Sequence, residues 1–521
     1  MSLKKSGIVI LASMLVMTGG SKLQAQENEY AGRRNTKIFT VFVSKGCSCP
    51  GPRGRVAKGL TTNDELLKKL QNACKGVDFI ARDITKTDTD IESVYNELES
   101  SKEELDGVLI IGLTNEYRLA FTGLPTIYVN NLFEWMNTPY RLYITGKDEN
   151  SIKIGGPEYK DGRIITAQLD RRNVCSPSVT SAMFEDLIGK INLIQAVKRL
   201  KESRILVATH TKYLAEVDYQ GDKHKHFPEN YNETYTRKIK ELLGVELVKI
   251  KPEEFYEAVK RVDFSKAEEI AQKWINEAEK MTDTTKFEVI KTAKSYLALE
   301  ALRKKYKCNA ISTHMRSITG SGKLEDLFNP GLGLMEFQKR GIQAICQEYE
   351  NVMAAHLLGY FIAGRPSMLG DFMMDTGNDA AIIMHCGAPL NPYGDDRRLP
   401  YVLRSHAESP VKGTLKPGSS TGAQVEFPEN ETVTIWKVYV LHKKIGLFTG
   451  KTVDGHSLYK DFDNIMCTSK LVAKVDNTKK ILKHSSPDAY GIHRAATFGN
   501  LRQQIKDLAV LIGFEVIEED R

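Results

Sequence analysis

Residues 330–392, PGLGLMEFQKRGIQAICQEYENVMAAHLLGYFIAGRPSMLGDFMMDTGNDAAIIMHCGAPLNP, form the stretch of this chain that decides the fold. Acids and one histidine stand here among strongly apolar runs; they are Glu348, Glu350, Asp371, Asp375, Asp379 and His385. Hard divalent cations such as Mn²⁺ and Mg²⁺ take carboxylate oxygen and sometimes imidazole, so this set suits them better than zinc. Acids at strand ends also cap the helix that follows. The stretch by itself therefore leaves a metal site and helix capping both open.

Upstream of this stretch, short apolar runs alternate with helical patterns. Residues 38–43 and 107–112 read as buried strands separated by helical segments, and the alternation restarts at residues 204–208. Strands that alternate with helices predict doubly wound parallel sheets. We therefore expect two α/β domains, over residues 37–180 and 181–384.

Downstream of residue 385 the pattern becomes rich in strands. Residues 431–440 alternate between apolar and polar side chains, as a half-buried strand does, and loops rich in Gly, Pro and Ser separate the strand-like runs. A helical pattern over residues 501–511 and a strand-like run over residues 514–517 close the chain. We expect residues 385–521 to form a β-rich third domain.

The first 26 residues, 1–26, have the pattern of an export signal. Lys4 and Lys5 precede the apolar run 8–17, and Leu-Gln-Ala at residues 23–25 fits a cleavage site. The apolar run is too short to span a bilayer. The pattern predicts an exported, periplasmic protein that is free of the membrane after cleavage, whereas an uncleaved leader would leave the protein in the cytoplasm. A buried first strand and a retained anchor are the alternatives.

Composition and motifs argue against several classes of function. The 521 residues carry a formal charge of +7 with basic and acidic residues interleaved, and no basic stripe with aromatic platforms points to nucleic acid. The eight cysteines show no zinc-knuckle or CxxC spacing. The GSGK of residues 320–323 lacks the first half of a phosphate-binding loop, and no Gly-x-Ser-x-Gly nucleophile motif stands in a fitting context.

Four pieces of the sequence resemble, in the same order, the active-site segments of the L-fucose isomerase and L-arabinose isomerase superfamily. The pieces are GIQAICQEYEN (341–351), RPSMLGDFMMD (365–375), AIIMHCGAP (381–389) and GIHRAATFGNLRQQIKDLAVLIGFEVI (491–517). The resemblance is clearest over residues 330–521. It implies two Rossmann-like doubly wound domains followed by a β-rich, barrel-like C-terminal domain, a homo-oligomer, and a divalent metal ion between the second and third domains.

In that superfamily two acids and a late histidine hold the metal, and the acids also move protons. Asp371 matches the second acid and His493 the late histidine, while His385 corresponds to a histidine that is a further metal ligand in some members. Where the superfamily has a glutamate after a cysteine, this chain has Gln347, which cannot take a proton from carbon. Glu348 is then the candidate for the missing proton carrier and metal ligand.

The resemblance implies a metal-dependent aldose–ketose isomerase, an intramolecular oxidoreductase that acts on a monosaccharide through an enediol, with Mn²⁺ as the expected metal ion and Mg²⁺ as the alternative. This chemistry needs a base, an acid and a cation. A non-catalytic carbohydrate-binding protein is one alternative, which Gln347 favours; another metal-assisted reaction on sugars is the second, which export favours. Trp436, Tyr393 and Tyr490 are candidates for stacking on a sugar ring, although such residues more often belong to the core or the rim.

Overall fold

The computed structural model describes most of the chain from residue 34 onward, with gaps. The described residues are 34–43, 62–84, 88–112, 117–131, 151–153, 158–160, 163–169, 180–208, 214–215, 230–314, 330–347, 349–405, 421–464, 467–485 and 490–521. The predicted export signal, residues 1–26, lies outside them. No helix of the described part is long and apolar enough to cross a membrane.

The first sheet has five parallel strands in the order β2-β1-β3-β4-β7. Its strands are β1 (Thr36–Val43), β2 (Val77–Ile84), β3 (Gly107–Ile111), β4 (Thr126–Asn131) and β7 (Ile164–Leu169). Helix α2 (Asn63–Ala73) and the long helix α5 (Thr180–Lys201) share an apolar cluster with one face, and α3 (Asp88–Ser101) packs on the other. Because both faces are covered, β3 is buried over its whole length and consists of an apolar run.

The second sheet has four parallel strands in the order β12-β11-β8-β9. Its strands are β8 (Arg204–Ala208), β9 (Glu246–Ile250), β11 (Ala310–Thr313) and β12 (Gln343–Cys346). The helices around it are α6 (Tyr231–Leu243), α7 (Pro252–Lys260), α8 (Phe264–Glu277), α9 (Lys286–Lys305), α11 (Gly331–Lys339) and α12 (Glu350–Ala363). Apolar side chains of α6 and α12 cover one face, and those of α7, α8, α9 and α11 the other.

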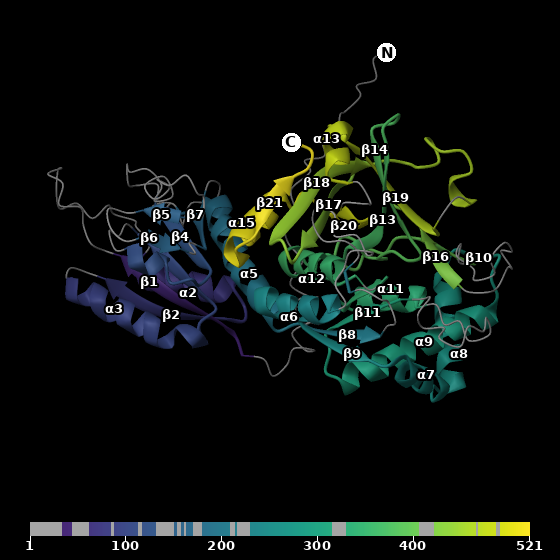
Figure 1. Ribbon diagram of the computed structural model, residues 1–521, viewed down its shortest axis with the longest axis horizontal. Helices are drawn as coiled ribbons and strands as arrows, with labels where there is room; N and C mark the ends of the chain where they lie inside the picture. Colours follow the sequence, from purple (N-terminus) through teal and green to yellow (C-terminus); the bar gives the residue numbers. More distant parts are fainter. Residues whose placement is uncertain are drawn as a thin grey trace, which may run out of the picture.

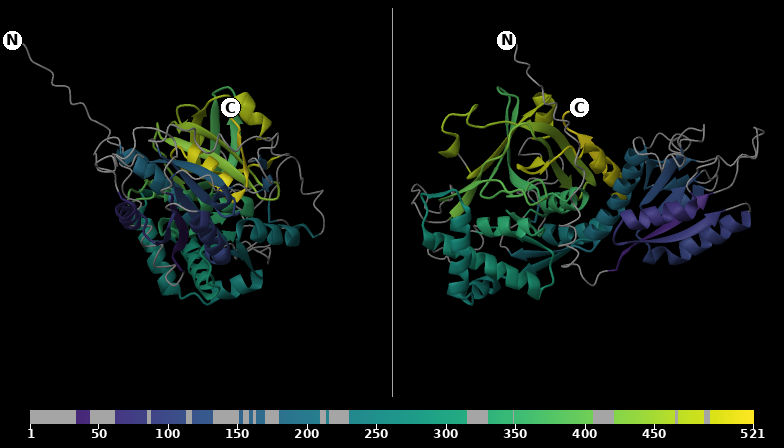
Figure 2. Two further views of the ribbon diagram at one scale, coloured as in Figure 1. Left: turned by 90° about the vertical axis from the view of Figure 1, so that its left-hand side faces the viewer. Right: turned by 180° about the vertical axis from the view of Figure 1, so that it is seen from behind.

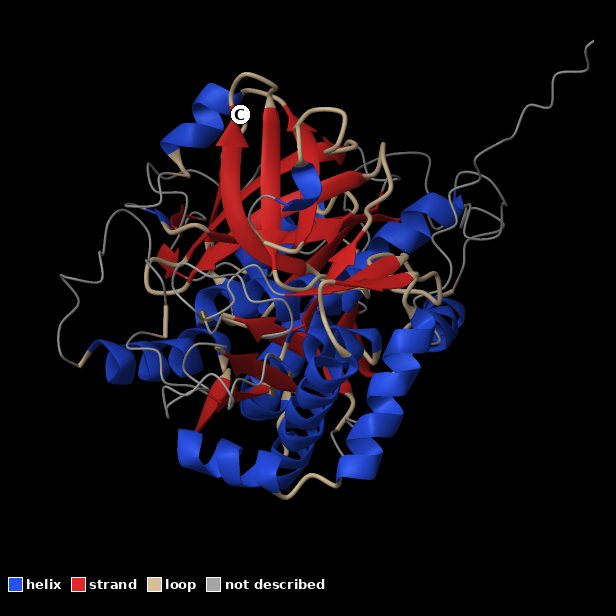
Figure 3. Ribbon diagram, turned by 90° about the vertical axis from the view of Figure 1, so that its right-hand side faces the viewer, coloured by secondary structure: helices blue, strands red, loops and turns tan. Residues whose placement is uncertain are grey.

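The third sheet closes on itself (Figure 3). Six antiparallel strands, β17-β20-β13-β14-β19-β18, form a ring because β18 also pairs with β17, and β21 adds to β18 in parallel. The strands are β13 (Met368–Asp375), β14 (Ala380–His385), β17 (Thr432–Tyr439), β18 (Lys444–Thr452), β19 (Ser469–Val475), β20 (His493–Phe498) and β21 (Glu515–Glu518). The ring therefore begins before residue 385, at β13.

Smaller elements complete the described part of the chain. A three-stranded sheet joins β10 (Lys280–Thr282), β15 (Tyr401–Ser405) and β16 (Thr421–Val425), and β5 (Ser151–Lys153) pairs with β6 (Glu158–Lys160). Two helices, α13 (Thr478–Lys483) and α15 (Arg502–Ile512), follow strands of the ring. Short 3-10 turns lie at Lys102–Glu104, Tyr117–Ala120 and Phe462–Asn464.

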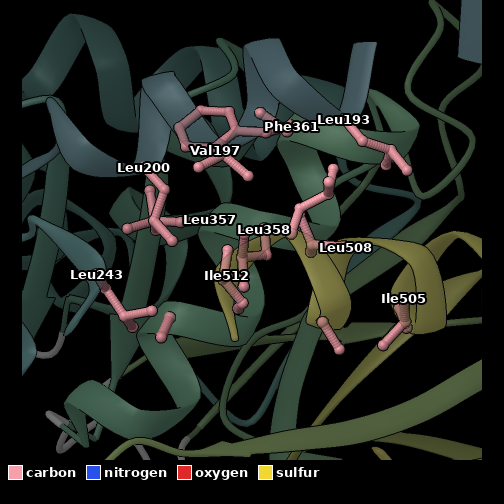
Figure 4. Close-up of a cluster of buried hydrophobic side chains, with 14 of the residues drawn as sticks. Leu193, Val197, Leu200, Leu243, Leu357, Leu358, Phe361, Ile505, Leu508 and Ile512 are labelled. Carbon is pink, nitrogen blue, oxygen red and sulfur yellow. The ribbon is translucent and has the colours of Figure 1, made fainter. Parts of the chain in front are cut away.

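A central apolar cluster joins the three sheets. Helix α5 contacts β7 of the first sheet and also packs against α12 and α15. The side chains that meet there come from α5, α6, α12 and α15 (Figure 4); they include Leu193, Val197, Leu200, Leu243, Leu357, Leu358, Phe361, Ile505, Leu508 and Ile512. Figures 1 and 2 show the first sheet at one end of the molecule, with the second sheet and the ring stacked at the other end. The cluster thus ties these parts together.

The alternation of strands and helices correctly predicted a mixed α/β protein with parallel sheets. The ring draws its strands from distant parts of the chain. Strands β13 and β14 directly follow α12 in the chain, yet their partners β20 and β19 lie about a hundred residues further on.

Candidate functional site

The candidate site lies where the carboxyl edge of the second sheet meets the ring. Strand β12 ends at Cys346, and α12 begins at Glu350 and packs against both β12 and the ring strands β17 and β20. The chain places β9 on one side of β8 and then places β11 and β12 on the other side. The order of the strands therefore reverses at β8. Open α/β sheets bind ligands at their carboxyl edge beside such a reversal.

Asp371 and His493 form the core of this site. They are register partners on β13 and β20, so their side chains leave the same face of the ring. The Nε2 atom of His493 lies 3.0 Å from Oδ1 of Asp371, and the side chains are 3% and 27% exposed. The structure therefore brings together two of the residues that the sequence singled out, with the carboxylate on the solvent side.

Tyr349 and His385 flank this pair. The ring centroid of Tyr349 lies 4.8 Å from that of His493 at an interplanar angle of 49°, and the His385 ring lies 6.4 Å from His493. The Nδ1 atom of His385 is 3.1 Å from the sulfur of Cys386. His385 is thus near the pair, as predicted from the resemblance, while Tyr349 was missed because nothing in its local sequence distinguishes it from a core tyrosine.

Gln347 occupies the turn between β12 and α12. It is half-buried, and its backbone carbonyl accepts a hydrogen bond of 3.0 Å from the backbone N–H of Tyr349. This bond ties the predicted Gln347 position to the aromatic ring beside His493. Glu348, the predicted proton carrier and metal ligand, lies outside the described residues.

Glu350 is one of the acids that the sequence singled out, although the sequence assigned it no role. Its side chain is fully buried at the first turn of α12, and its backbone N–H donates to the carbonyl of Leu214 at 2.8 Å. Burial raises the pKa of Glu350 to about 7, against the opposing effects of the Ser312 hydroxyl and the Lys249 ammonium. The burial of this carboxyl could not be predicted from the local sequence, because it depends on strands far away in the chain.

The described residues do not assemble the predicted metal centre. Among them, no group of three or more His, Cys, Asp and Glu side chains is placed to hold a metal ion. In the predicted set, Nε2 of His493 faces Asp371 directly, and Nδ1 of His385 faces Cys386. The prediction of a metal-binding protein is corrected on this ground, while the preference for Mn²⁺ over Mg²⁺ stays a prediction.

The aromatic residues proposed for sugar stacking have other partners. Trp436 is fully buried, and its indole N–H donates to the Thr497 hydroxyl at 3.1 Å. One face of Tyr393 is covered by the Arg397 guanidinium, 3.9 Å from the ring centroid. Tyr490 is buried and its ring lies 6.3 Å from that of Tyr439. These three side chains therefore belong to the packing of the third sheet and its loops.

Comparison with known proteins gives no family match. No protein-family model and no curated protein matches the chain. Among solved structures, an ABC transporter solute-binding protein from Burkholderia multivorans, with an unknown ligand assigned as alpha-D-erythrofuranose, is similar at 12% identity over 63% of this chain and 93% of that one, with a TM-score of 0.15. Another, from Bacillus halodurans with bound myo-inositol, has 14% identity over 64% and 92%, with a TM-score of 0.14.

A third similar structure is the solute-binding protein of a 5-methylthioribose transporter from Thermotoga lettingae, with 13% identity over 64% and 82% and a TM-score of 0.15. At such TM-scores these superpositions carry no argument about the fold, which rests on the strand pairings above. The predicted membership of the L-fucose and L-arabinose isomerase superfamily is nevertheless corrected, because no family model and no curated protein matches the chain. Four short pieces of sequence were too little to carry it.

Proposed function

We propose that this chain binds a monosaccharide without converting it, at the junction between the second sheet and the ring. The observation that carries the proposal is the Asp371–His493 pair, 3.0 Å apart, with the Tyr349 ring 4.8 Å from the imidazole. Sugar hydroxyls both donate and accept hydrogen bonds, and a carboxylate and an imidazole offer the complementary groups. An aromatic ring supplies an apolar surface for the C–H face of a pyranose or furanose.

Gln347 supports binding over turnover. An amide can hydrogen-bond a hydroxyl through its carbonyl or its NH₂ group, but it cannot remove a proton from carbon. Ligand sites in proteins commonly combine an apolar wall with a few placed polar groups, and Gln347 and His385 would add to the polar set here. The ligands named for the similar structures, a polyol and a pentose derivative among them, belong to the same chemical class.

The domain plan and the location belong to the same proposal. We take residues 37–180 and 181–384 as two Rossmann-like doubly wound domains and residues 385–521 as the main part of a barrel-like domain, which the two parallel sheets and the closed ring of strands support. We take residues 1–26 as a cleaved export signal that leaves the protein in the periplasm. The likeness to solute-binding proteins of transporters is consistent with a sugar-binding role there.

Calorimetric titration tests the proposal directly. The chain without residues 1–26 is titrated with a panel of aldoses, ketoses and myo-inositol, and each mixture is then held in D₂O and examined by NMR for deuterium at C1 and C2. We expect heat of binding for at least one sugar and no deuterium in it. The variant Asp371→Asn should lose most of the affinity, whereas Asp375→Asn, on the same strand but engaged with Tyr459 and Asn378, should keep it.

Three results contradict the proposal. Absence of binding for every sugar would remove the function, and deuterium entry that disappears in Asp371→Asn would show turnover instead. Equal losses in both aspartate variants would show that the affinity depends on β13 as a whole and would remove the role assigned to the Asp371–His493 pair.

A further inference from the structure

A groove lies on the second α/β unit, on the face of the sheet that α6 and α12 do not cover. It has a volume of about 720 Å³ and runs between α7 and α9, with the start of α8 at one end. Its floor is apolar and is formed by Ala258, Val262, Leu297, Ala298 and Leu302. Its lining includes none of the candidate sugar-site residues.

The two ends of the groove carry opposite charge. Glu253, Glu254 and Glu257 lie along α7 at one end, where Lys260 pairs with Glu257 at 2.9 Å, and Arg261 and Lys266 lie at the other. Lys305, at the end of α9, forms an ion pair of 2.6 Å with Glu254, which shows that the two helices run antiparallel. Asp263 also lies at the basic end, where its side chain caps α8 by accepting a hydrogen bond from the backbone N–H of Lys266.

An exposed aromatic side chain stands beside the basic end. Phe264, the first residue of α8, is 54% exposed and belongs to none of the apolar clusters of the described residues. Its neighbours Asp263 and Lys266 line the groove, so Phe264 lies next to the groove. This side chain extends the apolar surface of the groove, and contiguous apolar surface is typical of contact sites.

We propose that this groove is the contact surface of a two-fold homodimer, in which Phe264 of each copy enters the groove of the other. A two-fold axis brings the same patch of both copies together in opposite directions. This places the acidic end of one α7 against Arg261 and Lys266 of the second copy, and the aromatic side chain over the second copy's apolar floor at Ala301 and Leu302. The proposal does not depend on the sugar site.

Sedimentation velocity across a range of protein concentrations tests this surface. The chain without residues 1–26 should show a monomer–dimer equilibrium. Phe264→Asp should raise the dimer dissociation constant by at least about tenfold, because aromatic anchors dominate such interfaces. Leu482→Asp is the control: Leu482 is 41% exposed on α13, which does not line the groove, and this variant should leave the dissociation constant unchanged.

A charge exchange gives an independent measurement if Phe264→Asp perturbs the fold. Glu253→Lys and Lys266→Glu should each weaken the dimer, and the two changes in one chain should restore it, since each copy then offers the reversed pair. A wild-type chain that stays monomeric throughout would overturn the proposal. So would equal effects of Phe264→Asp and Leu482→Asp, additive losses in the charge double variant, or a monomer that takes up a peptide in the groove.

Discussion

The substitution Leu357→Ala tests whether the central apolar cluster holds the three sheets together. Leu357 is 1% exposed on α12 and lies in the cluster with side chains of α5 and α15. Removing a fully buried leucine side chain to alanine costs about 2–5 kcal/mol through lost transfer energy and the cavity left behind. Because partners on three helices surround this site and packed helices relax little, we expect about 3 kcal/mol.

Urea unfolding followed by far-UV circular dichroism and by tryptophan fluorescence measures this loss. Both signals should shift together in Leu357→Ala, because α5 carries the cluster into the first sheet. Leu482→Ala is the control; this side chain is 41% exposed on α13, and its loss should stay within about 0.5 kcal/mol. The reasoning is refuted if Leu357→Ala costs less than about 1 kcal/mol, or if one signal keeps a transition that the substitution does not move.

Three further outcomes follow from single positions. Tyr349→Ala should weaken sugar binding about tenfold in calorimetry while Tyr349→Phe keeps most of it, since the proposed role is an apolar ring surface; equal losses would contradict that role. Gly394→Ala should lower the free energy of unfolding by at least about 2 kcal/mol, because φ of Gly394 is +78° and a Cβ atom there would lie 2.1 Å from the carbonyl oxygen of Gly364. Gly189 lies on α5 with open space around it, so Gly189→Ala should raise the free energy of unfolding by about 0.5–1 kcal/mol. Urea unfolding curves measure both changes. Burial raises the pKa of Glu519 from 4.5 to about 7, so the folded state keeps a proton that the unfolded state releases, and stability should fall by about 3 kcal/mol as pH rises from 4.5 to 7. Urea unfolding at pH 5 and pH 8 should show a smaller fall in Glu519→Gln; an unchanged fall would show that this carboxyl is not its source.

Much of the secondary structure could be predicted because it depends on local pattern. The apolar run at 107–112 is the buried strand β3, and the alternation at 431–440 is β17, which runs from Thr432 to Tyr439. The helical pattern at 501–511 is α15, which runs from Arg502 to Ile512 and ends at a glycine with positive φ. The spacing of apolar residues indicates the type of each element, and capping and turn residues indicate its ends, within a window of about ten residues.

Sheet membership could not be predicted, because it depends on contacts between distant segments. Asp371 pairs with His493 across more than a hundred residues, and the three-stranded sheet joins β10, before α9, to β15 and β16 from the later chain. Nothing in the local pattern around residues 280–282 or 401–405 tells which strand lies beside which. Loop closure over such distances is decided by the packing of the whole chain.

The candidate site shows the same limit in its chemistry. Residue types and order picked out Asp371, His493 and His385, which the structure places near one another. The same residue types also suggested a metal centre, but residue type does not determine orientation. Tyr349 belongs to the candidate site because its ring lies next to His493. This contact could not be predicted from the sequence, because it depends on the pairing of the ring strands.

Helix α12 has a consequence for the speed of ligand capture. It rests on β12 of the second sheet and on β17 and β20 of the ring, so it fixes Tyr349 at its start relative to His493 on β20. Groups held by rigid elements on both sides of a site need no rearrangement when a ligand arrives. Association should therefore proceed in one kinetic phase whose observed rate rises in proportion to sugar concentration without reaching a plateau, as expected for capture by a site that is already in its final shape.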